Sequence, residues 1–132
     1  VEIVSWEGLL QTSDYISLHV PGGEKNQGII SKKEFAVMKK SASLIQVSRG
    51  GVVDEEALAE AIRNGQIRGA AVDVFSEEPP QKDNPLLKLE QVILTPHIGS
   101  NTVECMDRIA LDVAEDVHLV LSGKNPKHSI KR

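Results

Sequence analysis

The chain alternates short apolar segments of strand length with amphipathic segments of helical period, and this alternation restricts the folds open to it. Most of the strand-like segments are apolar on both faces, which is typical of strands buried in a parallel sheet. The segments between them are long enough for the helical crossovers that parallel strands require. We therefore predict an α/β fold, a doubly wound parallel sheet with helices on both sides. The expected strands are residues 1–4, 15–20, 43–47, 69–75 and 91–94.

Helix start and stop signals lie between these strands. Ser31 with Glu34 three residues later forms a capping box, which predicts a short helix. Asp54 is placed to cap a second helix, which we expect to stop at Asn64-Gly65. A long last helix follows Asn101 or Thr102, with apolar residues at three- and four-residue steps that predict a packed face.

Composition excludes several classes of function. The formal net charge of −4 supplies no positive field for nucleic acid, and Lys and Arg are scattered along the 132 residues. No apolar run approaches the ~20 residues of a membrane span, and we expect no signal peptide. The single cysteine, Cys105, cannot form an internal disulfide, so a reducing compartment is favoured. We expect a cytoplasmic protein that binds neither nucleic acid nor a membrane.

Unusual polar residues lie at or just beyond the ends of four of the expected strands. They are His19, Arg49, Asp73 with Glu78 beyond it, and His97. Each of them taken alone could be an ordinary surface or hydrogen-bonded residue. However, ligands of open α/β sheets bind outside the carboxyl ends of the strands, where all these residues would gather. Their convergence therefore favours a functional site.

The residue types in this group suit the chemistry of a 2-hydroxy or 2-keto acid. A histidine such as His97 can transfer a proton near neutral pH, and a carboxylate such as Glu78 can fix its tautomer. Arg49 offers a planar, always charged group that binds a carboxylate and can polarise a neighbouring carbonyl. These three side chains are the candidate catalytic residues.

Four motifs in order along the chain give it a family resemblance. It is similar, from Val1 to about Ser129, to the D-isomer-specific 2-hydroxyacid dehydrogenases, and most similar to members that act on 3-phosphoglycerate. The motifs are Leu18-His19-Val20-Pro21, Val47-Ser48-Arg49-Gly50-Gly51-Val52-Val53-Asp54, Ala71-Val72-Asp73-Val74-Phe75 with Glu78-Pro79-Pro80, and Leu94-Thr95-Pro96-His97-Ile98-Gly99.

The resemblance implies an NAD-dependent oxidoreductase that transfers hydride between nicotinamide and a D-2-hydroxy acid. His97 would be the general acid/base, Glu78 its orienting partner and Arg49 the group that binds substrate. Asp73 would contact the nicotinamide end of NAD. The other cofactor-binding residues implied by the family are Val20, Pro21, Val47, Ser48, Gly99 and Ser100.

One signature of a complete nucleotide-binding domain is absent from the 132 residues. The glycines never fall into the pattern G-x-G-x-x-G, which cradles a pyrophosphate. We therefore interpret residues 1–123 as a partial NAD-binding Rossmann domain, its second half, and residues 124–132 as a C-terminal tail. The edge at residues 15–20 should then be open, so we expect a homo-oligomer or a retained N-terminal fragment. The isolated chain should be inactive.

Two other functions were weighed against a dehydrogenase. The first is a noncatalytic binding or assembly module that keeps half of the Rossmann fold, and the sequence does not separate it from the enzyme. The second is a metal site built from the four histidines, His19, His97, His118 and His128. Their positions show no ligand spacing, so we expect no metal.

Overall fold

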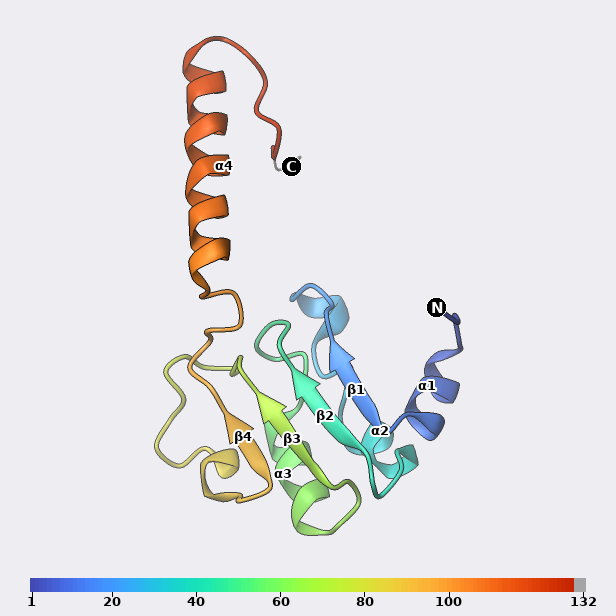
Figure 1. The fold of residues 1–132 in the computed structure, drawn as a ribbon. Helices are drawn as coiled ribbons and strands as arrows, with labels where there is room; N and C mark the ends of the chain where they lie inside the picture. The colour runs from blue at the N-terminus through green and yellow to red at the C-terminus, as the bar shows by residue number, and fades with distance from the viewer. Residues whose placement is uncertain (130–132) are drawn as a thin grey trace. The chain divides into compact units, whose positions relative to one another are not determined.

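A parallel sheet of four strands forms the centre of the first part of the molecule (Figure 1). The computed structural model describes residues 1–129 and divides into two compact units, Val1–His97 and Ile98–Arg132. The sheet lies in the first unit and has the strand order β1-β2-β3-β4. Its strands are β1 Tyr15–Leu18, β2 Ser43–Gln46, β3 Gly69–Val72 and β4 Val92–Leu94. The expected α/β class with a parallel sheet is confirmed, although the strands are shorter than expected.

The register of the sheet aligns the ends of all four strands. Leu18 pairs with Gln46, Gln46 pairs with Val72, and Val72 pairs with Leu94. Each of these residues is the last of its strand. The loops that follow the strands therefore all leave the sheet at the same edge, the one formed by the carboxyl ends of the strands.

The helices of the first unit are α1 Trp6–Thr12, α2 Lys32–Val37 and α3 Glu55–Arg63, with short 3-10 helices η1 Glu24–Asn26 and η2 Pro85–Lys88. Two of them, α2 and α3, begin where the sequence signals predict. Helix α2 starts with the expected capping box of Ser31 and Glu34. The Asp54 side chain accepts a hydrogen bond from the Ala57 N–H and caps α3. Gly65, with φ of 64°, follows the end of α3.

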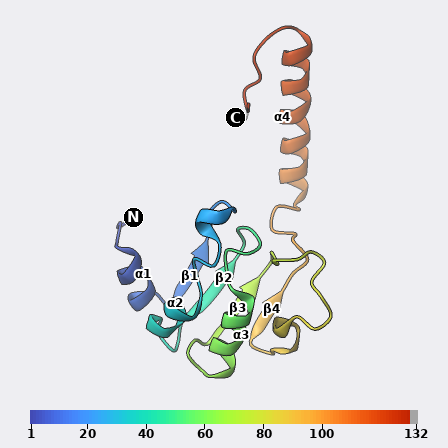
Figure 2. The same ribbon diagram turned by 180° about the vertical axis from the view of Figure 1, so that it is seen from behind.

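One face of the sheet carries the core of this unit. Helices α2 and α3 lie on that face (Figures 1 and 2), where Ile16 and Leu44 are buried. On the opposite face Tyr15 is 64% exposed and Ile93 is 69% exposed. Helices on both faces were expected, but within residues 1–97 only one face is covered. Buried side chains alternate with exposed ones in β1 and with partly exposed ones in β2, as in half-buried strands.

Residues 1–4 form no strand, so that part of the sequence prediction is wrong. The apolar side chains of Val1, Ile3 and Val4 are exposed. Strand β1 is an outer strand of the sheet and pairs only with β2. Apolar composition alone does not make a strand, because a strand needs a neighbour for its backbone hydrogen bonds.

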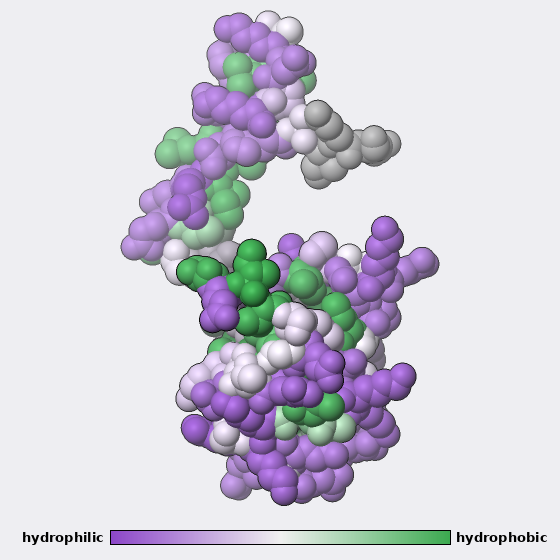
Figure 3. All heavy atoms as spheres, turned by 90° about the vertical axis from the view of Figure 1, so that its right-hand side faces the viewer, coloured by the Kyte–Doolittle hydropathy of each residue, from purple (hydrophilic) through white to green (hydrophobic). Residues whose placement is uncertain are grey.

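The second unit consists of a long helix and a tail that folds back on it. Helix α4, Val103–Leu121, is capped by the Thr102 side chain, which accepts a hydrogen bond from the Cys105 N–H. The N–H groups of Lys127 and His128 donate to the Asp116 carboxylate. No α4 side chain is buried within this unit, and apolar and polar side chains share its surface (Figure 3). The packing of its apolar face stays a prediction.

Across residues 1–129, the structure contains no helix with the length and apolar character needed to cross a membrane.

Candidate active site at the strand ends

The aligned strand ends bring most of the candidate residues to one edge of the sheet. Val20 and Pro21 follow β1, Arg49 follows β2, and Asp73 follows β3. His97 comes three residues after the end of β4 and is the last residue of the first unit. This edge is where ligands of open parallel sheets bind. The structure thus brings these residues to the carboxyl ends of the strands, where the sequence reasoning expected them to gather.

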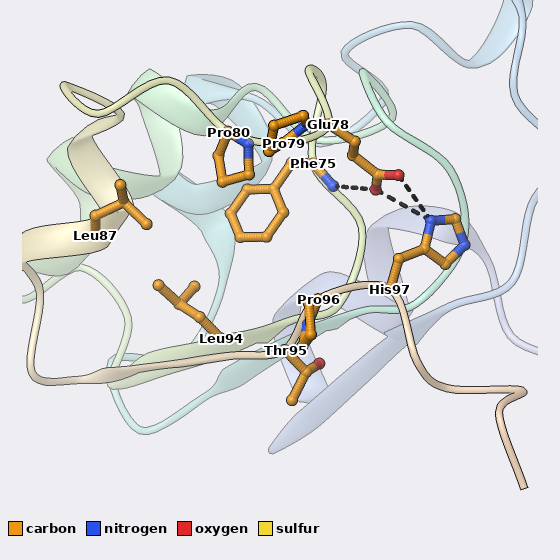
Figure 4. A pocket seen from close by; sticks show the side chains of 9 residues that line it. All are labelled: Phe75, Glu78, Pro79, Pro80, Leu87, Leu94, Thr95, Pro96 and His97. Carbon is orange, nitrogen blue, oxygen red and sulfur yellow. Dashed lines mark hydrogen bonds and ion pairs between the residues drawn. The ribbon is translucent and has the colours of Figure 1, made fainter.

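The side chains of His97 and Glu78 form a hydrogen-bonded pair at this edge. The Nδ1 atom of His97 lies 2.9 Å from Oε2 and 3.1 Å from Oε1 of Glu78 (Figure 4). The backbone N–H of Phe75 donates a further hydrogen bond to Oε1 at 3.1 Å. The side chains of His97 and Glu78 are 46% and 38% exposed, so a small molecule can reach them.

These contacts fix the charge of the carboxylate and the tautomer of the ring. The hydrogen bond from His97, followed by that from the Phe75 N–H, holds the pKa of Glu78 below its ordinary value. A charged carboxylate only accepts hydrogen bonds, so the proton on the His97 ring must lie on Nδ1. The Nε2 atom points away from Glu78 in Figure 4. It is therefore the nitrogen that can exchange a proton with a ligand.

The backbone of His97 adopts an uncommon conformation. Its φ is 54°, in the left-handed region that residues with a Cβ seldom occupy. Such a conformation costs energy and persists only where the surroundings hold it. The bonds from the ring to Glu78 are contacts that hold this residue in place.

A pocket of about 450 Å³ lies beside the His97–Glu78 pair, on the side away from Nε2. Its wall is mostly apolar, and Glu78 and His97 stand at its margin (Figure 4). The remaining lining residues are Phe75, Pro79, Pro80, Leu87, Leu94, Thr95 and Pro96. Because Nε2 points away from the Phe75 side of this pocket, a reacting group would approach His97 from the sheet edge instead.

Asp73 lies at the end of β3 and is joined to the end of β4. The Thr95 hydroxyl donates to Oδ1 of Asp73 at 2.5 Å, and Asp73 is 6% exposed. Thr95 was not among the residues selected from the sequence. A threonine after a strand carries no local signal, because its partner is 22 residues away in the chain.

Arg49 lies on a tight loop that packs against the main chain of the β3 end. Its side chain is exposed, and Nη1 donates to the carbonyl of Ser48 at 2.7 Å. A Cβ on the next residue, Gly50, would lie 2.2 Å from the carbonyl oxygen of Phe75, so no side chain fits there. The N–H of Phe75 is the group that donates to Glu78. The backbone of Phe75 therefore contacts both the Arg49 loop and Glu78, the partner of His97.

The other candidate cofactor residues fit the nicotinamide half of NAD. Pro21 and Val47 present exposed apolar side chains that suit a flat ring, while Val20 and Ser48 are more buried. The carboxylate of Asp73 at the same edge is an acceptor that suits the N–H groups of a carboxamide.

The residues of this edge do not account for binding of the pyrophosphate and adenosine half of NAD. No glycine pattern in the 132 residues suits the pyrophosphate. Gly99 and Ser100 belong to the second unit, and their contact with the cofactor stays a prediction. Within residues 1–129, no group of three or more His, Cys, Asp and Glu side chains is arranged to hold a metal ion.

Comparison with known proteins defines the class of this chain. Residues 1–99 match the family model described as the NAD binding domain of D-isomer specific 2-hydroxyacid dehydrogenases. The chain belongs to this family of enzymes, and the model that it matches is that of their NAD-binding domain. The family and the cofactor expected from the sequence are thereby confirmed.

Within the family, the similarity is to phosphoglycerate and lactate enzymes. D-3-phosphoglycerate dehydrogenase of Mycobacterium leprae is 44% identical over 124 residues, which cover 94% of this chain and 23% of that protein. The enzyme of the same name from Methanocaldococcus jannaschii is 49% identical over 116 residues, covering 88% and 22%. The crystal structure of D-lactate dehydrogenase with NAD+ from Lactobacillus jensenii matches with a TM-score of 0.90 at 28% identity, covering 98% and 43%. The chain thus spans about a quarter of these curated relatives.

Replacing His97 should change the ionisation of Glu78. In His97→Ala the carboxylate loses its main hydrogen-bond partner, so its pKa should rise toward the ordinary value of 4.5 while the Phe75 N–H still lowers it. The lowered pKa also means that stability from this pair is present above the ordinary pKa and is lost as the pH falls through the lowered value. Carbon-13 NMR titration of the Glu78 carboxyl measures the change.

The matched control is His128→Ala, which removes a histidine paired with Asp116 instead. It should leave the pKa of Glu78 unchanged. A Glu78 pKa that is the same in the native chain and in His97→Ala would contradict the assignment.

Proposed function

We propose that this chain carries the catalytic residues of a D-2-hydroxyacid dehydrogenase whose substrate resembles 3-phosphoglycerate. The observation that carries the proposal is the His97–Glu78 pair, which leaves Nε2 free at the edge that also bears Arg49 and Asp73. Residues 1–123 are the partial NAD-binding domain in this proposal and residues 124–132 a tail, of which residues 130–132 lie outside the described part. A cytoplasmic location stays a prediction.

Arg49 binds the substrate through its carboxylate. The guanidinium is charged at all relevant pH values and offers donors in a planar arrangement that matches two carboxylate oxygens. Its side chain is exposed, so it can release the Ser48 carbonyl and turn to a ligand. The same group can polarise the carbonyl of a 2-keto acid, because the two functions are adjacent in such molecules.

His97 transfers the proton. During oxidation Nε2 accepts the proton of the C2 hydroxyl while the hydrogen on C2 leaves with its electron pair; during reduction the same nitrogen returns the proton. NAD, when bound, supplies the acceptor or donor of that hydride. Glu78 stabilises the imidazolium formed during oxidation, because its charged carboxylate remains bonded to Nδ1.

Asp73 and the apolar side chains at the edge orient the nicotinamide. The buried carboxylate accepts a hydrogen bond from the Thr95 hydroxyl, which joins it to the end of β4. Val20, Pro21, Val47 and Ser48 line the same region. Support for a phosphoglycerate-like substrate comes from the names of the curated relatives, and D-lactate dehydrogenase among the solved structures widens the class to D-2-hydroxy acids.

His97→Ala tests the proposed acid/base. The variant is best made in a chimera in which this chain replaces the matching segment of the Mycobacterium leprae enzyme, so that turnover can be measured. Loss of a general acid/base should lower kcat by about 10²- to 10⁴-fold. His118→Ala, which changes an exposed histidine on α4, is the control and should keep the turnover of the chimera. A His97→Ala chimera within a few-fold of its parent would remove His97 from this role.

The 132-residue chain by itself should be inactive. The basis is the absence of a glycine-rich pyrophosphate loop from its sequence, which also favours the alternative of a noncatalytic binding or assembly module. Purified chain should give no NADH absorbance at 340 nm with NAD+ and D-3-phosphoglycerate or D-lactate. Measurable turnover would refute this prediction and would rule out the noncatalytic module as well.

The uncovered sheet face and the free edge of β1 support association with another polypeptide. Tyr15 and Ile93 are exposed on this face, and β1 pairs on one side only. Either a second copy of the chain or a retained N-terminal fragment would cover them. Sedimentation of the purified protein should give a mass above that of one chain, or reveal a second polypeptide. A dilute, homogeneous monomer without a second polypeptide would contradict the proposal.

A further inference from the structure

Gln46 is a buried polar residue among the apolar side chains of the first unit. It is the last residue of β2 and is 2% exposed. It stands on the same face as Leu44, which is buried beneath the helices. Burying an amide costs free energy unless its polar atoms are hydrogen-bonded. The partners of this side chain therefore show what the buried amide does.

All of the hydrogen bonds recorded for the Gln46 side chain go to the loop directly after β2. Its Nε2 atom donates to the carbonyl of Arg49 at 2.7 Å. Its Oε1 atom accepts from the Ser48 hydroxyl at 2.8 Å and from the Ser48 N–H at 3.4 Å. The side chain thus closes the turn that carries Arg49, using both its donor and its acceptor.

The backbone of Gln46 is fixed in the sheet on both sides. It is paired with Leu18 in β1 and with Val72 in β3. Its carbonyl accepts a hydrogen bond from the N–H of Asp73 at 2.9 Å. The Gln46 backbone is therefore fixed relative to the end of β3. Its side-chain hydrogen bonds hold the Arg49 loop in place relative to the same strand end.

We propose that Gln46 is a positioning residue for Arg49, and that it fixes the direction in which the guanidinium meets the substrate carboxylate. The inference rests on the proposed function of Arg49. Gln46 itself is buried and does not touch the substrate. Without its amide, the loop loses three hydrogen bonds and Arg49 samples several directions, which weakens carboxylate binding.

A double-mutant cycle tests whether Gln46 acts through Arg49. Gln46→Met keeps the length of the side chain and removes its donor and acceptor. In the chimera it should lower kcat/KM for the 2-hydroxy acid by about tenfold, mainly through KM. In the Arg49→Ala background the same change should lower kcat/KM by less than about twofold, because the group being positioned is already gone.

Two outcomes separate this inference from the proposed function. Equal losses in both backgrounds would overturn the inference, since a purely structural role is additive. A normal kcat/KM in Arg49→Ala alone would instead overturn the proposed role of Arg49. Ile16→Val is the control for general loss of packing, because Ile16 is buried in β1 and is not among the loop contacts. It should lower the melting temperature and leave KM unchanged.

A second readout needs no catalysis. Hydrogen–deuterium exchange on the 132-residue chain should show faster exchange of the Ser48 and Val52 amides in Gln46→Met than in the native chain. These amides donate to Gln46 and to the Arg49 carbonyl, respectively. Unchanged exchange at both positions would overturn the inference, since the loop would then be held without the amide.

Discussion

The parallel register of the sheet is the constraint on which the site depends. Leu18, Gln46, Val72 and Leu94 form one row across the four strands, and each of them ends its strand. Four loops that are distant in sequence therefore leave the sheet side by side. A shift of one residue in any pair would turn a whole strand over, since side chains alternate between faces. The apolar side chains beneath α2 and α3 prevent that shift, so the core fixes the site.

Within this frame, the ionisation of Glu78 determines what His97 can do. The carboxylate is bonded to both the His97 ring and the Phe75 N–H, and its pKa lies below the ordinary value. It therefore stays a pure acceptor and keeps the ring proton on Nδ1. One nitrogen is committed to the protein and the other is left for chemistry. In the proposed function, a contact within the first unit therefore decides which ring nitrogen would exchange the proton.

Much of this arrangement could be predicted from the sequence because its signals are local. The Ser31–Glu34 capping box and the Asp54 cap operate within one helical turn, and both are present in the structure. What the sequence missed depends on partners that are distant in the chain or in the fold. Residues 1–4 are apolar but have no strand beside them, and one sheet face is uncovered within residues 1–97. Thr95 after β4 donates a hydrogen bond to Asp73 after β3, 22 residues away in the chain, so its neighbours in sequence give no sign of this contact.

The close approach of Gly50 to Phe75 has a consequence for how this site tolerates change. One residue, Phe75, lies between the loop that carries Arg49 and the His97–Glu78 pair: its N–H donates to Glu78, and its carbonyl oxygen leaves no room for a Cβ at position 50. The gap between the Arg49 loop and the His97–Glu78 pair is thus set by main-chain atoms of one residue. Side chains around it can vary in size without altering that gap. A single methyl group at position 50 would alter it, although Gly50 is not one of the proposed catalytic residues.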